Sequence, residues 1–101
     1  MADFRVVCPS TRMTANFVKL GFTPGFGLTH TLARLIGVQK ANLLFMTGRR
    51  INGETASQWS LADVFTDDDN VRNAAIELAS EMAVNAPLAL VSLREQMRPG
   101  L

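Results

Sequence analysis

The chain has 101 residues, of which 48% are hydrophobic and 19% are charged. This length permits one domain with a modest core, and this apolar content excludes a disordered tail, which could not bury enough apolar surface. The apolar runs are far shorter than the roughly 20 residues needed to cross a bilayer, so we expect no membrane span. The single cysteine, Cys8, has no partner in the chain, and residues 2–5 lack a signal-like leader, so we expect a cytoplasmic protein.

Charge is divided unevenly along the chain. Residues 1–53 carry seven basic residues and one acidic residue (net +6), whereas residues 54–101 carry three basic and eight acidic residues (net −5). Two interpretations remain open: the basic half faces an anionic ligand such as a phosphate, or the two halves neutralise each other. Because the basic residues are spread singly, without interleaved aromatic residues, we expect no nucleic-acid partner. No carboxylate base can come from residues 4–53, since none is present there.

The first half predicts short extended segments, a loop rich in glycine and two helices. Gly21, Pro24, Gly25 and Gly27 fall within seven positions, which favours a loop with unusual backbone dihedrals or a close backbone approach. The predicted elements are a strand at Phe4–Val7, an extended or mixed segment at Arg12–Leu20, the loop, a helix ending at Gly37 with Leu28, Leu32, Leu35 and Ile36 on one face, and a helix over Val38–Met46.

The second half predicts three further helices and one short strand. The predicted elements are a short helix over Glu54–Trp59 capped by Asn52, a strand-like segment at Leu61–Phe65, a long helix capped by Thr66 or Asp67 with Val71, Ala75, Leu78 and Met82 inward, and a last helix from Pro87 with Leu90, Leu93 and Met97 inward. Isolated pairs of short strands are not stable in water. We therefore expect the strands to find partners in another chain or in sequence outside this one.

Four motifs follow one another in a fixed order. They are Asp3-Phe4-Arg5, then Leu-Gly-x-x-Pro-Gly-x-Gly-x-Thr at residues 20–29, Leu-x-Arg-aliphatic-x-Gly at residues 32–37, and Ala-x-x-Leu-x-x-Thr-Gly at residues 41–48. A lone Pro-Gly-x-Gly is a weak signal, but the series with these spacings resembles the crotonase (enoyl-CoA hydratase/isomerase) superfamily. The resemblance covers residues 2–98.

The resemblance implies a fold class and a division of the chain. We expect an α/β, mostly helical, C-terminal part of a crotonase-like ββα spiral, with two or three short strands followed by helices. The expected parts of this partial domain are the end of the spiral core and the glycine loop (1–27), a helix pair and exit (28–65), and C-terminal helices (66–101). For the parent protein, the resemblance implies a homo-oligomer, either a trimer or a dimer of trimers.

The resemblance also implies a function and site residues. The family binds acyl-CoA thioesters and stabilises a thioester enolate through two backbone N–H groups, with coenzyme A as part of the substrate and no separate cofactor. The glycine loop and its surroundings would line the acyl pocket, and Arg94 would contact CoA. The implied substrate-binding residues are Phe17, Leu20, Gly21, Pro24, Gly25 and Phe26.

The sequence departs from the family pattern at the catalytic positions. The family's oxyanion donors and first catalytic glutamate would lie before Met1, so the chain looks like the back half of a domain. The second catalytic glutamate aligns with Phe17, and the aspartate of some relatives aligns with Gly25. We therefore assign no catalytic residue and expect the isolated chain to be inactive. The alternative is a catalytically silent subunit with an oligomeric or scaffolding role; a nucleotide-phosphate binder lacks the full glycine fingerprint.

The remaining reactive side chains have structural explanations. His30 is expected on the outer side of its helix, Cys8 in a buried position, and Trp59 as a packing anchor. Asp67, Asp68 and Asp69 stand at a predicted helix start, where capping explains them better than a metal site. We expect no metal site.

Overall fold

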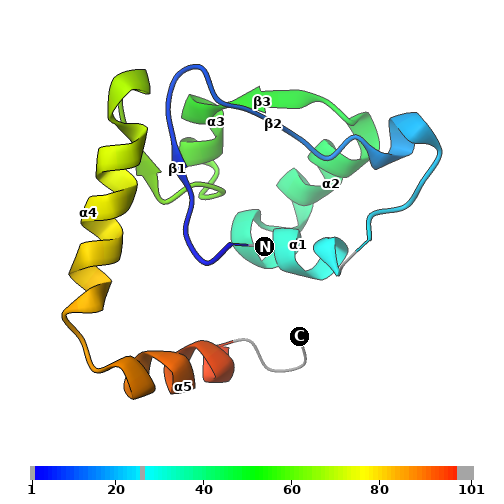
Figure 1. The fold of residues 1–101 in the computed structure, drawn as a ribbon. Helices are drawn as coiled ribbons and strands as arrows, with labels where there is room; N and C mark the ends of the chain where they lie inside the picture. Colours follow the sequence, from blue (N-terminus) through cyan, green and yellow to red (C-terminus); the bar gives the residue numbers. More distant parts are fainter. Residues whose placement is uncertain (1, 26, 98–101) are drawn as a thin grey trace.

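The computed structural model describes residues 2–25 and 27–97, so Phe26 lies outside the described residues. The described elements form an α/β arrangement with two small strand pairs among the helices (Figure 1). In chain order they are β1 (Val6–Val7), β2 (Arg12–Thr14), η1 (Phe17–Leu20, a 3-10 helix), α1 (Leu28–Ile36), α2 (Val38–Thr47), β3 (Arg50–Asn52), α3 (Gly53–Gln58), β4 (Val64–Phe65), η2 (Asp68–Asn70, a 3-10 helix), α4 (Val71–Ala83) and α5 (Pro87–Met97).

The strands pair with one another within this chain, in two two-stranded sheets, and the expected strand partners outside the chain stay a prediction. β1 runs parallel to β4 with Val6 opposite Val64, and β2 runs antiparallel to β3 with Met13 opposite Ile51. The half-buried Arg5 reinforces the first pair, because its guanidinium donates to the Leu61 carbonyl and its backbone N–H donates to the Asp63 carboxylate at 2.9 Å. The strand β3 was not predicted, since three residues between two helices carry no readable alternation.

The core lies where α1, α2, α3 and the strands meet. Leu32 and Ile36 of α1 are buried, as the predicted apolar face requires, and Ala41 and Leu44 of α2 pack against them. These side chains exclude water from the centre of the helix pair, which is the main stabilising contribution here. The buried core cluster consists of Val7, Leu32, Ile36, Ala41, Leu44, Ile51, Ala56, Leu61 and Ala62.

Helix α3 begins as predicted, at an Asn52 cap. The Asn52 side-chain oxygen accepts a hydrogen bond from the Thr55 backbone N–H at 2.8 Å, which satisfies one of the free donors of the first turn. Its first residue, Gly53, packs so tightly against the turn after β1 that a Cβ there would lie 2.0 Å from the Cys8 carbonyl oxygen. The glycine therefore permits α3 and this turn to touch.

The start of α4 differs from the prediction in two respects. A short 3-10 turn, η2, precedes it, and neither Asp67 nor Asn70 makes a side-chain capping bond. Asp68 does not cap either: its carboxylate accepts a hydrogen bond from the Ser10 backbone N–H at 3.2 Å and so ties η2 to the turn after β1. The buried residue of α4 is Ala74 rather than Ala75.

Helix α5 is largely exposed: of the positions predicted to face inward, Leu90 is half-buried, but the inward orientation predicted for Leu93 and Met97 is wrong within this chain. Leu93 and Met97 are 53% and 61% exposed, and no residue of α5 is buried. In Figure 1, α5 turns away from α4 and runs beneath the rest of the molecule, and neither the core cluster nor the side chains packed against it include a described residue of α5. Among the described residues, no single helix is long and apolar enough to cross a membrane; η2–α4 and α5 reach that length and composition only together, as a pair bent by 106°.

Candidate functional site

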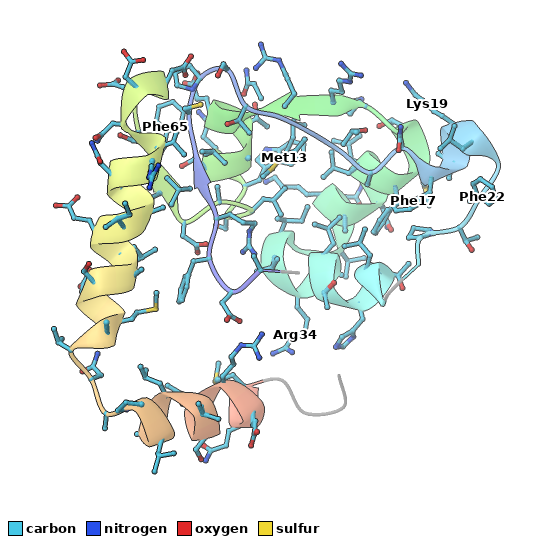
Figure 2. All side chains as sticks on the ribbon, viewed as in Figure 1. Met13, Phe17, Lys19, Phe22, Arg34 and Phe65 are labelled. Atoms are coloured by element: carbon cyan, nitrogen blue, oxygen red, sulfur yellow. The ribbon has the colours of Figure 1, made fainter. Side chains whose placement is uncertain are left out.

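The predicted substrate-binding residues that the structure describes lie at one end of the molecule, on η1 and the loop that follows it. Figure 2 shows Phe17, Lys19 and Phe22 grouped at this end, beside α2. Phe17 is half-buried, whereas Leu20 and Phe22 are 64% and 65% exposed. Exposed apolar side chains grouped in this way are typical of an interaction surface. We call Phe17, Val18, Leu20 and Phe22 the η1 surface.

Local backbone bonds shape η1. The Lys19 N–H donates to the Asn16 carbonyl at 3.1 Å, and the Phe22 N–H donates to the Phe17 carbonyl at 2.9 Å. The chain leaves η1 through Gly21, whose φ of 81° lies in the left-handed region that glycine adopts without strain. These bonds hold Phe17 and Phe22 on the same turn, so the structure brings together three of the six predicted substrate-binding positions: Phe17, Leu20 and Gly21.

Gly25 is the loop glycine that the fold of this chain does not explain. Its φ is outside the left-handed region, and no described atom lies within 4 Å of a Cβ built on it. Nothing in the described part of the chain therefore requires a glycine at position 25, because neither its dihedral angles nor its surroundings exclude a side chain. Its neighbour Pro24 is half-buried and Gly25 itself is exposed, so the backbone here is open to a ligand or to another segment.

The elements around this end supply positive charge and no carboxylate. No Asp or Glu occurs in residues 4–53, which include β1, β2, η1, α1, α2 and β3. Several of the basic residues have structural contacts: Arg5 with Asp63 at 3.6 Å, and Lys40 over the Trp59 ring, with Nζ 5.6 Å from the ring centroid. Residues 4–53 therefore offer no carboxylate that could transfer a proton at this end of the molecule.

Arg94, the predicted CoA contact, lies on α5, apart from η1 (Figure 1). Its Nε is 2.8 Å from the Asp3 carboxylate, and both side chains are largely solvent-exposed. The structure therefore does not bring Arg94 together with the η1 surface. It places the guanidinium instead in an ion pair between the two ends of the described chain.

Three other candidates of the sequence, Cys8, His30 and Trp59, have the structural places expected of them. Cys8 is buried, with its Sγ 3.3 Å from Ser10 Oγ, and His30 is exposed on α1. Trp59 packs partly buried against the core. No group of three or more His, Cys, Asp and Glu side chains that could hold a metal occurs among the residues that the structure describes.

Three residues at this end, Val18, Lys19 and Phe22, were not singled out from the sequence. Phe22 sits at a variable position of the glycine motif, where its hydrophobicity alone could have marked it as part of the exposed surface. Lys19 lies between two apolar positions of η1, and its contact with residue 48 joins segments far apart in the chain. No local pattern signals such a contact.

Comparison with known proteins defines the class. All 101 residues match the family described as Enoyl-CoA hydratase/isomerase. The chain is 31% identical over 99 residues to the short-chain-enoyl-CoA hydratase of Clostridium acetobutylicum, covering 98% of this chain and 38% of that enzyme. It also superimposes on the crystal structure of an enoyl-CoA hydratase from Bacillus anthracis with a TM-score of 0.82 and 36% identity, covering 87% of this chain and 34% of the other.

The chain therefore belongs to the enoyl-CoA hydratase/isomerase family and has its crotonase fold. A Thermobifida fusca protein whose structure contains CoA is a further neighbour, with a TM-score of 0.86 and 25% identity over 99% of this chain and 40% of that one. The chain spans less than half the length of the relatives it matches.

Proposed function

We propose that this chain is the acyl-CoA-binding portion of an enoyl-CoA hydratase/isomerase family protein whose parent stabilises a thioester enolate. In this proposal the η1 surface is one wall of the acyl pocket, formed by Phe17, Leu20 and Phe22, and the open backbone at Gly25 lies against the acyl group. The observation that carries it is the exposure of Leu20 and Phe22, with Phe17 half-buried beside them, close to a glycine that the fold of the chain does not require. The basic residues of the first half would favour the anionic CoA.

The proposal divides the chemistry between segments. The described residues would bind and orient the acyl chain and exclude water from it, while no carboxylate of residues 4–53 can act as an acid or base. The donors that stabilise the enolate would come from the rest of the family's domain. We further propose that the parent acts in the cytoplasm as a homo-oligomer, for which the free Cys8 and the exposed apolar side chains of α5 are the supporting features.

Binding measurements on the chain test the proposal. Burial of even two methylene groups is worth about 1.6 kcal/mol, so octanoyl-CoA should bind about tenfold more tightly than free CoA in calorimetry. Phe22→Ala should reduce this preference. Phe65→Ala is the matched control, since Phe65 is also exposed but lies on β4, away from η1 (Figure 2). Equal affinities for octanoyl-CoA and CoA, or equal effects of the two substitutions, would contradict the proposal.

The alternative is a catalytically silent subunit with an oligomeric or scaffolding role. Two features favour it: the family resemblance aligns Phe17 with the catalytic glutamate of hydratases, and α5 exposes Leu88, Val91 and Met97. Sedimentation analysis with and without octanoyl-CoA distinguishes the two. A stable oligomer that binds no acyl-CoA would support the silent subunit over the acyl-CoA-binding portion.

A further inference from the structure

The side chain of Lys19 lies across the end of α2. Gly48 closes that helix in the left-handed conformation, with φ of 61°, and its N–H donates to the Leu44 carbonyl at 2.9 Å. A Cβ built on Gly48 would stand 2.9 Å from Lys19 Cγ, 3.1 Å from Cε and 3.2 Å from Cδ. Three carbons of the Lys19 side chain therefore cover this glycine. Any residue with a Cβ at position 48 would force the Lys19 side chain or the backbone to move.

Gly48 is itself held from two sides. It is buried, and its carbonyl accepts a hydrogen bond from the Thr14 hydroxyl at 3.2 Å, which ties it to β2 as well as to α2. Lys19 as a whole is exposed. This is the arrangement of a lysine whose aliphatic stem packs on the protein while its ammonium group stays in water.

We propose that Lys19 is the positioning residue of the η1 surface. The backbone bonds within η1 set its shape but not its place on the molecule, and none of its four residues is buried. The Lys19 stem on Gly48 supplies a fixed contact between this turn and α2, and so determines where Phe17 and Phe22 stand. This inference deepens the proposed function and rests on it, because it assigns a residue that aligns the acyl wall.

The aliphatic stem of Lys19, and not its charge, makes the contact that positions the η1 surface. Lys19→Met, which keeps an unbranched chain of similar length, should therefore retain the contact, whereas Lys19→Ala should lose it. Arg34→Ala is the matched control for loss of a surface cation, because Arg34 is exposed on α1 and points away from η1 (Figure 2).

Amide hydrogen exchange on the full chain tests the positioning directly. In Lys19→Ala, the Gly21 and Phe22 amides should exchange about tenfold faster, which corresponds to about 1.4 kcal/mol, while the amides of α4 serve as an internal reference for intact folding. Lys19→Met and Arg34→Ala should stay within about twofold of the wild type. Unchanged exchange in Lys19→Ala, or a Lys19→Met variant that behaves like Lys19→Ala, would overturn the proposal.

A second readout concerns the ligand. The preference for octanoyl-CoA over CoA should fall about threefold in Lys19→Ala and return in Lys19→Met, a rescue that a general loss of stability would not produce. If the wild-type chain shows no such preference, the proposed function fails. The exchange data then still decide whether Lys19 holds η1 in place.

Discussion

Replacing Gly53 by alanine tests how tightly α3 is joined to the turn after β1. The added Cβ would lie 2.0 Å from the Cys8 carbonyl oxygen and 2.9 Å from its carbonyl carbon, whereas ordinary contact begins at 3.4 Å. The two backbones would have to separate by about 1.4 Å. Cys8 cannot yield readily, because its N–H donates to Thr11 Oγ1 and its carbonyl accepts from the Thr11 N–H, both at 3.0 Å.

Such overpacking against backbone should cost about 3 kcal/mol of folding free energy, at the upper end of the usual range. For a domain of this size, that loss lowers Tm by roughly 12–24 °C. Urea unfolding followed by far-UV circular dichroism measures the change. Gly25→Ala is the matched control, since no described atom would meet its Cβ, and it should be neutral or slightly stabilising. A Gly53→Ala midpoint equal to that of the wild type would refute the close approach.

Three further outcomes are expected. A hydrogen bond with the Cys8 thiol and one from the Ser10 N–H hold the pKa of Asp68 below its usual 3.8. The ionised carboxylate therefore stabilises the fold above that pH, and this contribution is lost as pH falls through the lowered pKa. Asp68→Asn should remove that part of the acid dependence of stability in urea titrations from pH 6 to 2.5. Asn52→Ala should cost about 1 kcal/mol in the same assay at pH 7, because the Thr55 N–H loses its acceptor, and a change below about 0.3 kcal/mol would argue against the cap. The purified chain should not hydrate crotonyl-CoA in an absorbance assay. Measurable turnover would show that a carboxylate outside residues 4–53 acts as the catalytic acid or base.

The helices could be predicted because their signals are local. The apolar spacing of Leu32 and Ile36 and the left-handed glycine at position 48 mark α1 and the end of α2 within the residues themselves. The strand pairs could not be predicted, since Val6 and Val64 pair across 58 positions and two residues carry no alternation. The role of Asp68 was missed for the same reason: its partner, Ser10, belongs to a distant turn.

The candidate site was predictable only in part. The family motif located the η1 surface and the glycine loop, and the structure brings Phe17, Leu20 and Gly21 together. The motif could not indicate that Arg94 is paired with Asp3, because that contact depends on the direction in which α5 leaves α4. Nor could it indicate the packing of Lys19 on Gly48, because these residues are far apart in the chain and meet only in the folded structure.

Each strand pair joins a segment that precedes the glycine loop to a segment that follows it. β1 and β2 end before residue 21, and their partners β4 and β3 begin after residue 49. A protease that cleaves the exposed backbone near Gly25 would therefore leave two pieces still hydrogen-bonded to each other. We expect them to co-purify as a nicked, non-covalent complex and to recombine after separation in urea, so that the two fragments can be produced and labelled independently.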